Sequence, residues 1–292
     1  MNNLLVITGQ TATGKTKLAL DYASRLNGEI INADSRQVYT DLDIITGKDK
    51  SELNKSGAKV YLLDVATPDK TFSSYDFVSL AGPIIKDIWR RKKTPIIVGG
   101  SYLYIKHLLY GQDIKIPPNP KLRRELEKLS VEELQKKLKS LDKIVFSKLN
   151  NSDLHNPRRL IRKIEIATAS IKSIRSIKST TPNKSSTLQA LSFKIIGLKH
   201  KNKESLTNAV TERVEKRLKQ GAFKEVKRLL KLGYKKTDPG LQTIGYKQLI
   251  AHIDGEVTLD EALKDWINKE IQYAKRQLTF MKMDSQIEWV IV

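Results

Sequence analysis

The sequence predicts an α/β protein: a P-loop-type parallel sheet flanked by helices, with a helical insertion domain. Three observations predict this fold class. A glycine-rich phosphate-binding pattern, GQTATGKT, follows the first apolar run. Short apolar runs alternate with helical patterns over the first third of the chain. A basic helical stretch then interrupts this alternation, so we expect residues 1–114 and 190–292 to form the core and residues 115–189 the insertion.

The first part of the core predicts alternating strands and helices. Residues 3–8 form a short apolar run, and residues 17–26 carry apolar side chains at the spacing of a helix face. Further apolar runs occupy residues 29–33, 59–65 and 95–100. Short buried strands that alternate with helices form a parallel sheet with right-handed crossovers, which is the arrangement we expect.

The insertion begins where prolines break this pattern. IPPNP at 116–120 forbids a continuing helix and marks a boundary. Beyond it, residues 130–133 match a capping box, and Pro157 is suited to open a helix. The polar segment 179–187 has the composition of a linker.

The last part of the chain predicts a return to the sheet. Residues 193–198 read as a strand, and 204–220 carry apolar side chains every fourth residue, as in a helix that packs on the core. A second capping box at 258–261 opens a long helix through Met283, and residues 287–292 close the chain as a last strand.

Composition excludes several classes of function. The chain has 292 residues and no cysteine, which excludes disulfide scaffolds, thiol catalysis and cysteine metal sites. Four scattered histidines disfavour a histidine metal site. No apolar run approaches the roughly 18 residues of a membrane span. We expect a cytoplasmic monomer without a membrane partner.

The positive charge is concentrated in the middle of the chain. The formal net charge is +21; residues 121–178 carry 16 basic and 7 acidic side chains, and residues 194–236 carry 14 and 4. Such a concentration favours a polyanionic partner, and nucleic acid before membrane, because no apolar face accompanies it.

The phosphate loop is the strongest chemical signal. Its residues are Gly9, Gln10, Thr11, Ala12, Thr13, Gly14, Lys15 and Thr16. Backbone amides and the helix N-terminus bind the anion, Lys15 adds a charge, and the Thr16 hydroxyl is a ligand for Mg²⁺. The loop therefore predicts binding of a phosphate or diphosphate, with ATP and other nucleotides among the candidates.

Two acidic residues follow the second and third predicted strands. Asp34 should face the phosphate loop, because ligands bind beyond the carboxyl ends of parallel strands. Capping of the next turn is the structural alternative for Asp34. Asp64 resembles the acidic residue that holds magnesium in nucleotide hydrolases, although capping a turn is the more common role of such a residue.

Five segments, in this order along the chain, resemble the tRNA dimethylallyltransferases. They are GQTATGKT, NADSRQVYTDLDI (32–44), PIIVGGSYLYIKHLL (95–109), LQTIGYKQL (241–249) and YAKRQLTF (273–280). The resemblance implies transfer of a prenyl group from dimethylallyl diphosphate to the exocyclic amino nitrogen of the adenosine 3′ of the anticodon in tRNA. Diphosphate is then the leaving group.

The resemblance also implies roles for individual residues. Asp34 is the general base or hydrogen-bond acceptor for the amino group, and Arg213 contacts the diphosphate together with Thr16 and the loop. The segments aligned with tRNA-contacting positions, here the anticodon stem-loop, comprise these residues: Asp34, Ser35, Arg36, Gln37, Ser101, Arg158, Arg159, Leu160, Ile161, Arg162, Gln242, Thr243, Ile244, Gly245, Tyr246 and Lys247.

The chain departs from the family pattern at a few positions. The family usually has Pro and Ser where this loop has Gln10 and Thr13, and Thr-Gly where this chain has Ser101 and Tyr102. We expect the loop substitutions to be tolerated, because backbone amides bind the anion, and the bulky Tyr102 to narrow the tRNA channel.

Three other functions are compatible with the residues alone. A relative that prenylates free adenine nucleotides would share the core without needing a basic insertion. A P-loop nucleotide kinase or RNA-stimulated ATPase would share the loop, although no clear acidic hydrolysis strand is present. A non-catalytic RNA-binding module would leave Asp34 beside an intact phosphate loop unexplained.

Overall fold

The computed structural model describes residues 3–111, 116–175 and 192–292. The chain divides into two compact units, a core unit of Met1–Tyr110 with Leu188–Val292 and an insertion unit of Gly111–Thr187. These bounds lie close to those expected from the proline break and the return to the sheet. The predicted linker 179–187 falls outside the described residues.

The core unit contains a parallel sheet with the strand order β3-β2-β4-β1-β5-β6. Its strands are β1 (Asn3–Gly9), β2 (Gly28–Asn32), β3 (Val60–Tyr61), β4 (Thr94–Val98), β5 (Ser192–Lys199) and β6 (Ile287–Ile291). The parallel sheet is the one predicted. β3 is shorter than expected, because Leu62 and Asp64 adopt positive φ angles of 62° and 55°, which are incompatible with a strand.

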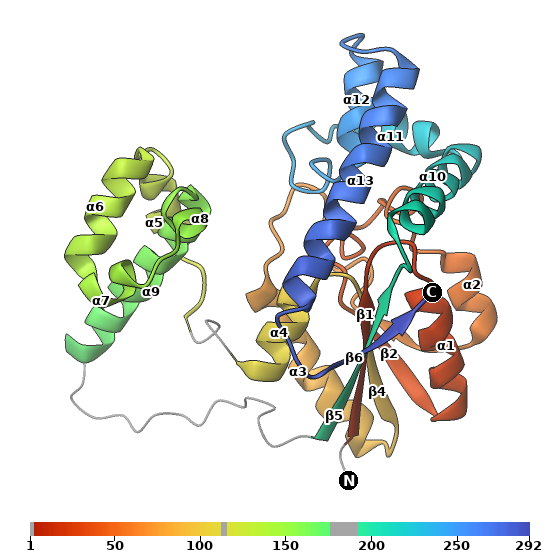
Figure 1. Ribbon diagram of the computed structural model, residues 1–292, viewed down its shortest axis with the longest axis horizontal. Helices are drawn as coiled ribbons and strands as arrows, with labels where there is room; N and C mark the ends of the chain where they lie inside the picture. The colour runs from red at the N-terminus through yellow and green to blue at the C-terminus, as the bar shows by residue number, and fades with distance from the viewer. Residues whose placement is uncertain (1–2, 112–115, 176–191) are drawn as a thin grey trace. The chain divides into compact units, whose positions relative to one another are not determined.

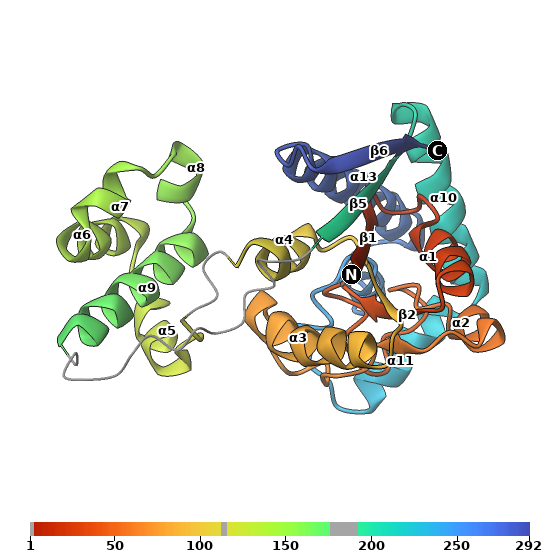
Figure 2. The ribbon, with the colours of Figure 1, turned by 90° about the horizontal axis from the view of Figure 1, so that it is seen from below.

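Helices cover both faces of the sheet, as Figure 2 shows. α1 (Lys15–Arg25) packs on one face, against alternate strand residues such as Ile7. α3 (Ser74–Arg90) and α4 (Tyr102–Tyr110) pack on the other face, against the intervening residues such as Val6. Strands buried on both faces read as continuous apolar runs, which is why the sequence marked them so clearly.

The C-terminal helices form a second core beyond the sheet. They are α10 (Lys203–Lys219), α11 (Ala222–Lys231), α12 (Tyr246–Ile253) and α13 (Leu259–Met281), and α2 (Lys50–Ser56) lies in the connection before β3. Trp266 and Tyr246 are fully buried in this core. In Figure 1, α13 runs from this cluster past the carboxyl ends of the strands towards α4. The predicted capping box at Thr258 starts α13.

The insertion unit is a small helical bundle. Its helices are α5 (Pro120–Leu126), α6 (Val131–Leu141), α7 (Lys143–Ser147), α8 (Asn151–Leu154) and α9 (Pro157–Arg175). Leucines of α5, α6 and α9 form its core. The predicted capping box starts α6, and Pro157 is the first residue of α9, because proline lacks only an amide hydrogen that the first turn leaves unpaired.

A search of the described helices for one long and apolar enough to cross a membrane finds none.

A buried carboxylate stabilises β2 near its amino end. Glu29 is 2 % exposed and accepts hydrogen bonds from Arg91 at 2.5 Å, from Lys93 at 2.8 Å and from the Tyr61 hydroxyl at 2.8 Å. The bonds from Arg91, followed by those from Lys93 and Tyr61, outweigh burial and lower the pKa of Glu29 to about 2. The ionised carboxylate therefore ties β2 to β3 and to the end of α3.

We predict that Glu29→Gln lowers the free energy of unfolding by about 2 kcal/mol at pH 7, because it removes the charge of a buried carboxylate that pairs with two partly exposed cations. A lowered pKa contributes stability that is complete above the usual value near 4.5 and is lost as the pH falls towards about 2. Denaturant titrations of both proteins should therefore converge below pH 4.5. Asp87→Asn, which removes the exposed carboxylate bound to Arg91, is the control and should change little. Equal stability of wild type and Glu29→Gln at pH 7 would contradict the prediction.

Candidate active site

The phosphate loop joins β1 to α1, where its backbone geometry requires glycine. Gly9 has a φ of +141°, and a Cβ atom there would lie 2.2 Å from the Leu198 carbonyl oxygen of β5. Gly14 has a φ of +78° and precedes α1 without a side-chain cap. The first-turn amides of α1 are therefore left for an anion rather than for a capping side chain.

A cavity of about 200 Å³ opens at the carboxyl ends of the strands. The phosphate loop, the residues after β2 and β4, α10 and α13 all contribute to its walls. It brings together the predicted residues 11–16, Asp34, Gln37 and Arg213. A second cavity of about 310 Å³ adjoins it and shares Arg213. Segments that are distant in the sequence thus surround one space.

Lys15, Lys17 and Arg213 line this cavity, and the charges of Lys15 and Arg213 act on each other. The Lys15 ammonium donates to the Gln10 carbonyl oxygen at 2.5 Å. Burial, and then the neighbouring Arg213, lower the pKa of Lys15 to about 8, while Asp34 opposes the shift. Arg213 donates to the Thr46 carbonyl at 3.4 Å, and its buried Nε has no partner among the described residues. A pair of neighbouring cations beside the phosphate loop is suited to a ligand with more than one negative charge.

Asp34 lies just after β2 with its carboxylate in the cavity wall. Its Oδ1 accepts the Arg36 amide at 2.8 Å, so the carboxylate also caps a turn, as the structural alternative had it. The Ser101 hydroxyl accepts the amide of Ser35 at 2.8 Å and joins this turn to the end of β4. The capping bond fixes the orientation of the carboxylate, and the two roles are compatible.

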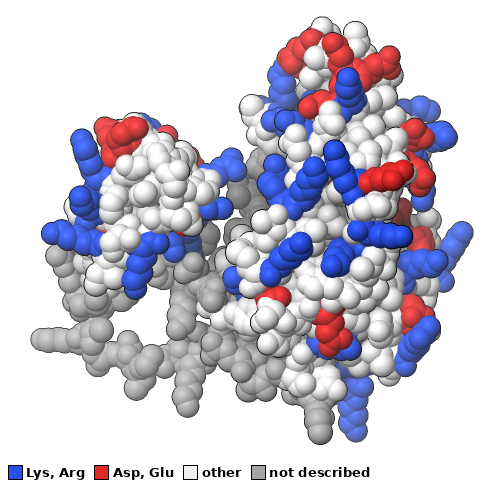
Figure 3. Space-filling model, in the orientation of Figure 1, with Lys and Arg blue, Asp and Glu red and all other residues white. Residues whose placement is uncertain are grey.

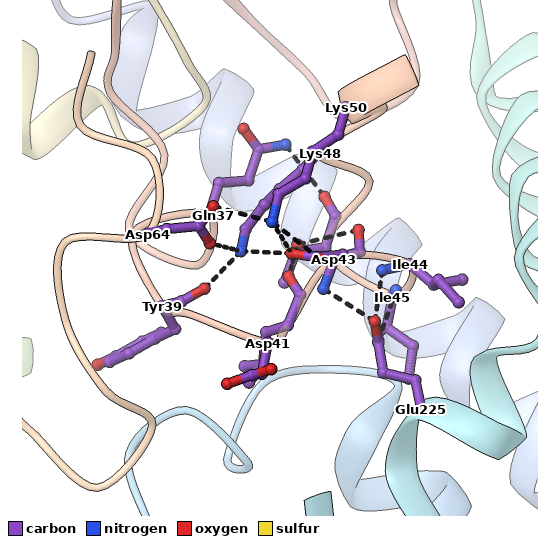
Figure 4. Close-up of polar contacts among 12 residues, drawn as sticks. Gln37, Tyr39, Asp41, Asp43, Ile44, Ile45, Lys48, Lys50, Asp64 and Glu225 are labelled. Carbon is purple, nitrogen blue, oxygen red and sulfur yellow. Dashed lines mark hydrogen bonds and ion pairs between the residues drawn. The ribbon is translucent and has the colours of Figure 1, made fainter. Parts of the chain in front are cut away.

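A buried lysine holds the connection that follows Asp34, as Figure 4 shows. The Lys48 side chain is fully buried, and its ammonium binds the Tyr39 carbonyl and the carboxylates of Asp43 and Asp64. Lys50 bridges the same two carboxylates from the surface. Asp64 therefore pairs with lysines, which corrects its comparison with a magnesium-holding residue.

Glu225 of α11 holds the same connection from the other side. Its carboxylate accepts the amides of Asp43, Ile44 and Ile45 at 2.9, 2.7 and 3.2 Å, and the buried Tyr246 hydroxyl also donates to it. Three amides pointing at one carboxylate form a compact turn without any helix or strand. The connection between β2 and α2 is thus fixed by side chains rather than by regular secondary structure (Figure 4).

Two glutamines anchor α13 to the strand ends. Gln277 accepts the Thr11 amide at 3.0 Å and donates to the Gly100 carbonyl at 3.0 Å. Gln10 is buried, donates to the Ala274 carbonyl at 3.3 Å and accepts the amide of His200 at 3.0 Å. A Cβ atom at Gly100 would lie 2.3 Å from the Gln277 amide nitrogen, so a larger residue there would displace the Gln277 side chain from its bonds. The Gln10 side chain therefore has a structural role that the family's proline cannot perform in the same way.

Sequence reasoning missed several cavity residues. Asn32, Asp49, Glu52, Tyr273 and Gln277 line the cavity beside the predicted ones. Tyr273 and Gln277 lie in the YAKRQLTF segment, which carried the family resemblance without a residue role. No spacing within that helix indicates which of its side chains face a site at the other end of the chain.

The predicted tRNA-contacting residues of the core differ in exposure. Arg36, Gln242 and Lys247 are exposed, and Ser35, Ser101 and Ile244 are partly buried. Gln37 donates to the carbonyls of Thr46 and Gly47 at 3.1 and 2.9 Å. Thr243, Gly245 and Tyr246 are buried, and the Tyr246 ring is part of the second core. From this group, the surface side chains are the ones available to a large ligand.

The predicted residues of the insertion unit lie at the start of α9. Arg158 is exposed, and Arg159 forms an ion pair with Asp153 at 2.5 Å. Leu160 and Ile161 are buried in the core of the bundle, so their side chains are unavailable for a tRNA contact. Arg162 donates to the Ile116 carbonyl at 2.8 Å and to Glu165 at 3.2 Å, which gives it a structural role.

Tyr102 does not lie where the sequence suggested. Its ring is buried in the main core, packs edge-on against Phe280, and its hydroxyl donates to Asp284. The Tyr110 hydroxyl donates to the same carboxylate at 2.8 Å. The expectation that Tyr102 narrows a tRNA channel is therefore wrong, because Tyr102 lies on the face of α4 that packs against the core.

The surface charge suits a polyanion. On the face shown in Figure 3, Lys and Arg are spread widely over both units, and acidic side chains gather at the tip of the core unit. That tip lies between α12 and α13 and carries the exposed residues Asp254, Glu256, Asp260 and Glu261. Smaller acidic groups also lie on the insertion unit and along one edge of the core unit, and the widespread Lys and Arg promote association with phosphate-rich ligands.

Comparison with known proteins gives consistent similarities. The family described as IPP transferase matches residues 37–284. A tRNA dimethylallyltransferase of Acetivibrio thermocellus is 38 % identical, over 99 % of this chain and 92 % of the relative. A tRNA dimethylallyltransferase of Anoxybacillus flavithermus is also 38 % identical, over 98 % of this chain and 89 % of the relative.

Solved structures show the same fold. A full-length tRNA isopentenylpyrophosphate transferase from Bacillus halodurans has a TM-score of 0.71 at 33 % identity, covering 100 % of this chain and 90 % of that one. A eukaryotic dimethylallyltransferase described as acting on tRNA has a TM-score of 0.80 at 25 % identity, covering 99 % of this chain and 73 % of that one.

We predict that the affinity of the free protein for inorganic diphosphate falls as the pH rises through about 8, because Lys15 then loses its charge. The limiting slope is about tenfold per pH unit. Lys15→Arg is the control, because arginine stays charged. Both proteins are titrated by calorimetry from pH 6.5 to 9.5. Diphosphate ionises in the same way in both titrations, so the ratio of the two affinities reports the ionisation of Lys15 alone. Parallel curves for the two proteins would contradict the assignment.

Proposed function

This chain belongs to the IPP transferase family, that of the tRNA dimethylallyltransferases, and we propose the following substrates and reaction for its cavity. The enzyme transfers a dimethylallyl group from dimethylallyl diphosphate to the exocyclic amino nitrogen of the adenosine 3′ of the anticodon in tRNA. Diphosphate is released. We place the reaction in the cytoplasm, where the anticodon stem-loop of tRNA is the natural substrate, and assign it to the monomer.

One observation carries this proposal: the Asp34 carboxylate shares a small cavity with a cationic phosphate cradle. Asp34, Lys15 and Arg213 all line that cavity. An aromatic amine is a poor nucleophile until its proton has an acceptor, and diphosphate departs readily only when its growing charge is neutralised. The carboxylate meets the first requirement and the two cations meet the second.

The residues assign each part of the step. The bond between C1 of the allyl group and the diphosphate oxygen breaks, and the bond from the amino nitrogen to C1 forms. The proton that leaves the nitrogen passes to the Asp34 carboxylate. Lys15, Arg213 and the loop amides take up the negative charge of the departing diphosphate. The atoms and charges of substrates and products therefore balance, and no further reactant is needed.

The donor set near Thr16 fits Mg²⁺. Thr16, Asp34, Asp49 and Glu52 all line the cavity, and Mg²⁺ is commonly held by one or two protein oxygens together with substrate phosphates. We propose that the Thr16 hydroxyl holds the ion with the diphosphate oxygens. When bound, the ion supplies charge neutralisation for the leaving group. The same cradle has the chemistry to accept the phosphates of ATP, which then compete with diphosphate.

Nucleoside analysis tests the function directly. tRNA is incubated with the protein and dimethylallyl diphosphate, digested, and analysed by mass spectrometry for a prenylated adenosine. A parallel reaction with AMP tests the prenylation of free nucleotides, and a reaction with ATP alone tests for phosphate release. Product in tRNA alone supports the proposal; product only from AMP, or phosphate release without prenyl transfer, contradicts it.

We predict that Asp34→Asn slows the chemical step by about 10²–10⁴, because it keeps the shape of the side chain but removes the proton acceptor. Single-turnover kinetics at saturating substrates measure this step. Affinity for each substrate should change much less. Asp41→Asn is the control, since this carboxylate lies on the same connection but pairs with Arg228 at its surface. An unimpaired rate would leave Asp34 with the capping role only.

We predict that Arg158→Ala flattens the plot of log tRNA affinity against log salt by about 0.7–0.9, the contribution of one neutralised phosphate. Arg158 is exposed at the start of α9, whereas Arg162 bonds within the insertion unit. Arg162→Ala should therefore lower the unfolding midpoint and leave the salt dependence unchanged. Nitrocellulose filter binding at several salt concentrations measures both. The reverse pattern would show that Arg162 holds the phosphate.

A further inference from the structure

The cavity contains one aromatic ring. Among its lining residues in the described part of the chain, Tyr273 alone is aromatic, and Ala12 and Val98 are the aliphatic ones. Most remaining lining residues are charged or carry amide or hydroxyl groups. An allyl group that enters this cavity therefore has a single large carbon surface to contact.

The position of this ring is fixed by the anchoring of α13. Tyr273 lies one helical turn before Gln277, which is bonded to both the phosphate loop and the end of β4. Its neighbour Ala274 accepts a hydrogen bond from Gln10. Burial, followed by the proximity of Asp34, raises the pKa of Tyr273 to about 12, so its hydroxyl stays protonated. The ring is thus neutral and lies close to the proposed base.

The proposed reaction creates a positive charge in this space. As the bond from C1 to the diphosphate oxygen lengthens, positive charge develops over the allyl carbons before the new bond to nitrogen forms. An allyl cation has no group that forms strong hydrogen bonds. A carboxylate in direct contact with it would react with it to form an ester. The face of an aromatic ring attracts a cation through its quadrupole without reacting with it.

We propose that Tyr273 is a catalytic residue whose ring stabilises the positive charge on the allyl group during transfer. This inference rests on the proposed function and adds a residue to it. The phosphate loop and Arg213 then stabilise the departing diphosphate, and Tyr273 stabilises the allyl group. The departing diphosphate thus lies beside cations, and the allyl fragment lies beside the electron-rich face of a ring.

Replacing Tyr273 tests the ring and the hydroxyl separately. Tyr273→Phe keeps the ring and should retain the single-turnover rate within about threefold. Tyr273→Leu removes the ring and should slow the chemical step by about 3- to 30-fold, the range of a cation–π contact in a partly or fully desolvated site. The dissociation constant for dimethylallyl diphosphate should change less than the rate, because the charge develops only in the transition state.

Fluorination separates electrostatics from shape. Phenylalanine, 3,5-difluorophenylalanine and pentafluorophenylalanine placed at position 273 have nearly the same shape, but fluorine withdraws electron density from the ring face. The logarithm of the single-turnover rate should fall steadily along this series. The matched control is pentafluorophenylalanine at Phe280, a ring of the same helix that packs against Tyr102 outside the cavity. That substitution should leave the rate unchanged.

The outcomes distinguish this inference from the function on which it rests. If the wild-type protein prenylates tRNA but the fluorinated series shows equal rates, Tyr273 contributes shape alone and the inference is overturned. A Tyr273→Phe variant as slow as Tyr273→Leu would overturn it as well, because the hydroxyl would then carry the effect. A wild-type protein without prenyl transfer would instead overturn the proposed function. Thermal unfolding of each variant identifies loss of rate through misfolding.

Discussion

The attachment of α13 to the strand ends is the constraint on which the cavity depends. Gln10 and Gln277 connect the phosphate loop, β4 and β5 to this one helix, and each side-chain amide both donates and accepts a hydrogen bond within the protein. Satisfied buried amides fix position closely, because any shift leaves a polar group unpaired. Without this attachment, the phosphate loop would lack one wall, and Tyr273 would have no fixed position near Asp34.

The second requirement is an ordered connection after β2, which carries Asp34 at one end and Gly47 at the other. This segment has few hydrogen bonds of regular secondary structure, and buried charges take their place. The Lys48 ammonium binds carbonyl and carboxylate oxygens of its turns, and the Glu225 carboxylate accepts backbone amides. Buried charges are costly unless they are fully paired, and here each has several partners. The segment is consequently held in one conformation without being a helix or a strand, which suits a site that must bind and release a large substrate.

The cavity brings charges of both signs close together. Burial, and then the charge of Arg213, lower the pKa of Lys15, and the buried Arg213 Nε has no partner among the described residues. A bound anion would add negative charge beside both cations, which is the electrostatic basis of the proposed diphosphate site. Asp34 lies near enough to oppose the shift, and the basic surface beyond the cavity acts at longer range on a polyanion.

The sequence by itself determined the parallel sheet, the phosphate loop, the basic insertion and the position of Asp34 at the strand ends, because these depend on local spacing, turn chemistry and composition. It overstated β3, where positive φ angles at Leu62 and Asp64 end the strand, and it misplaced Tyr102, whose direction depends on how α4 packs. Only the tertiary structure decided that Asp64 pairs with Lys48, that Leu160 and Ile161 are buried, and that Tyr273 and Gln277 reach the cavity. These outcomes join residues far apart in the chain, and no periodicity within one segment encodes which distant side chain completes a site.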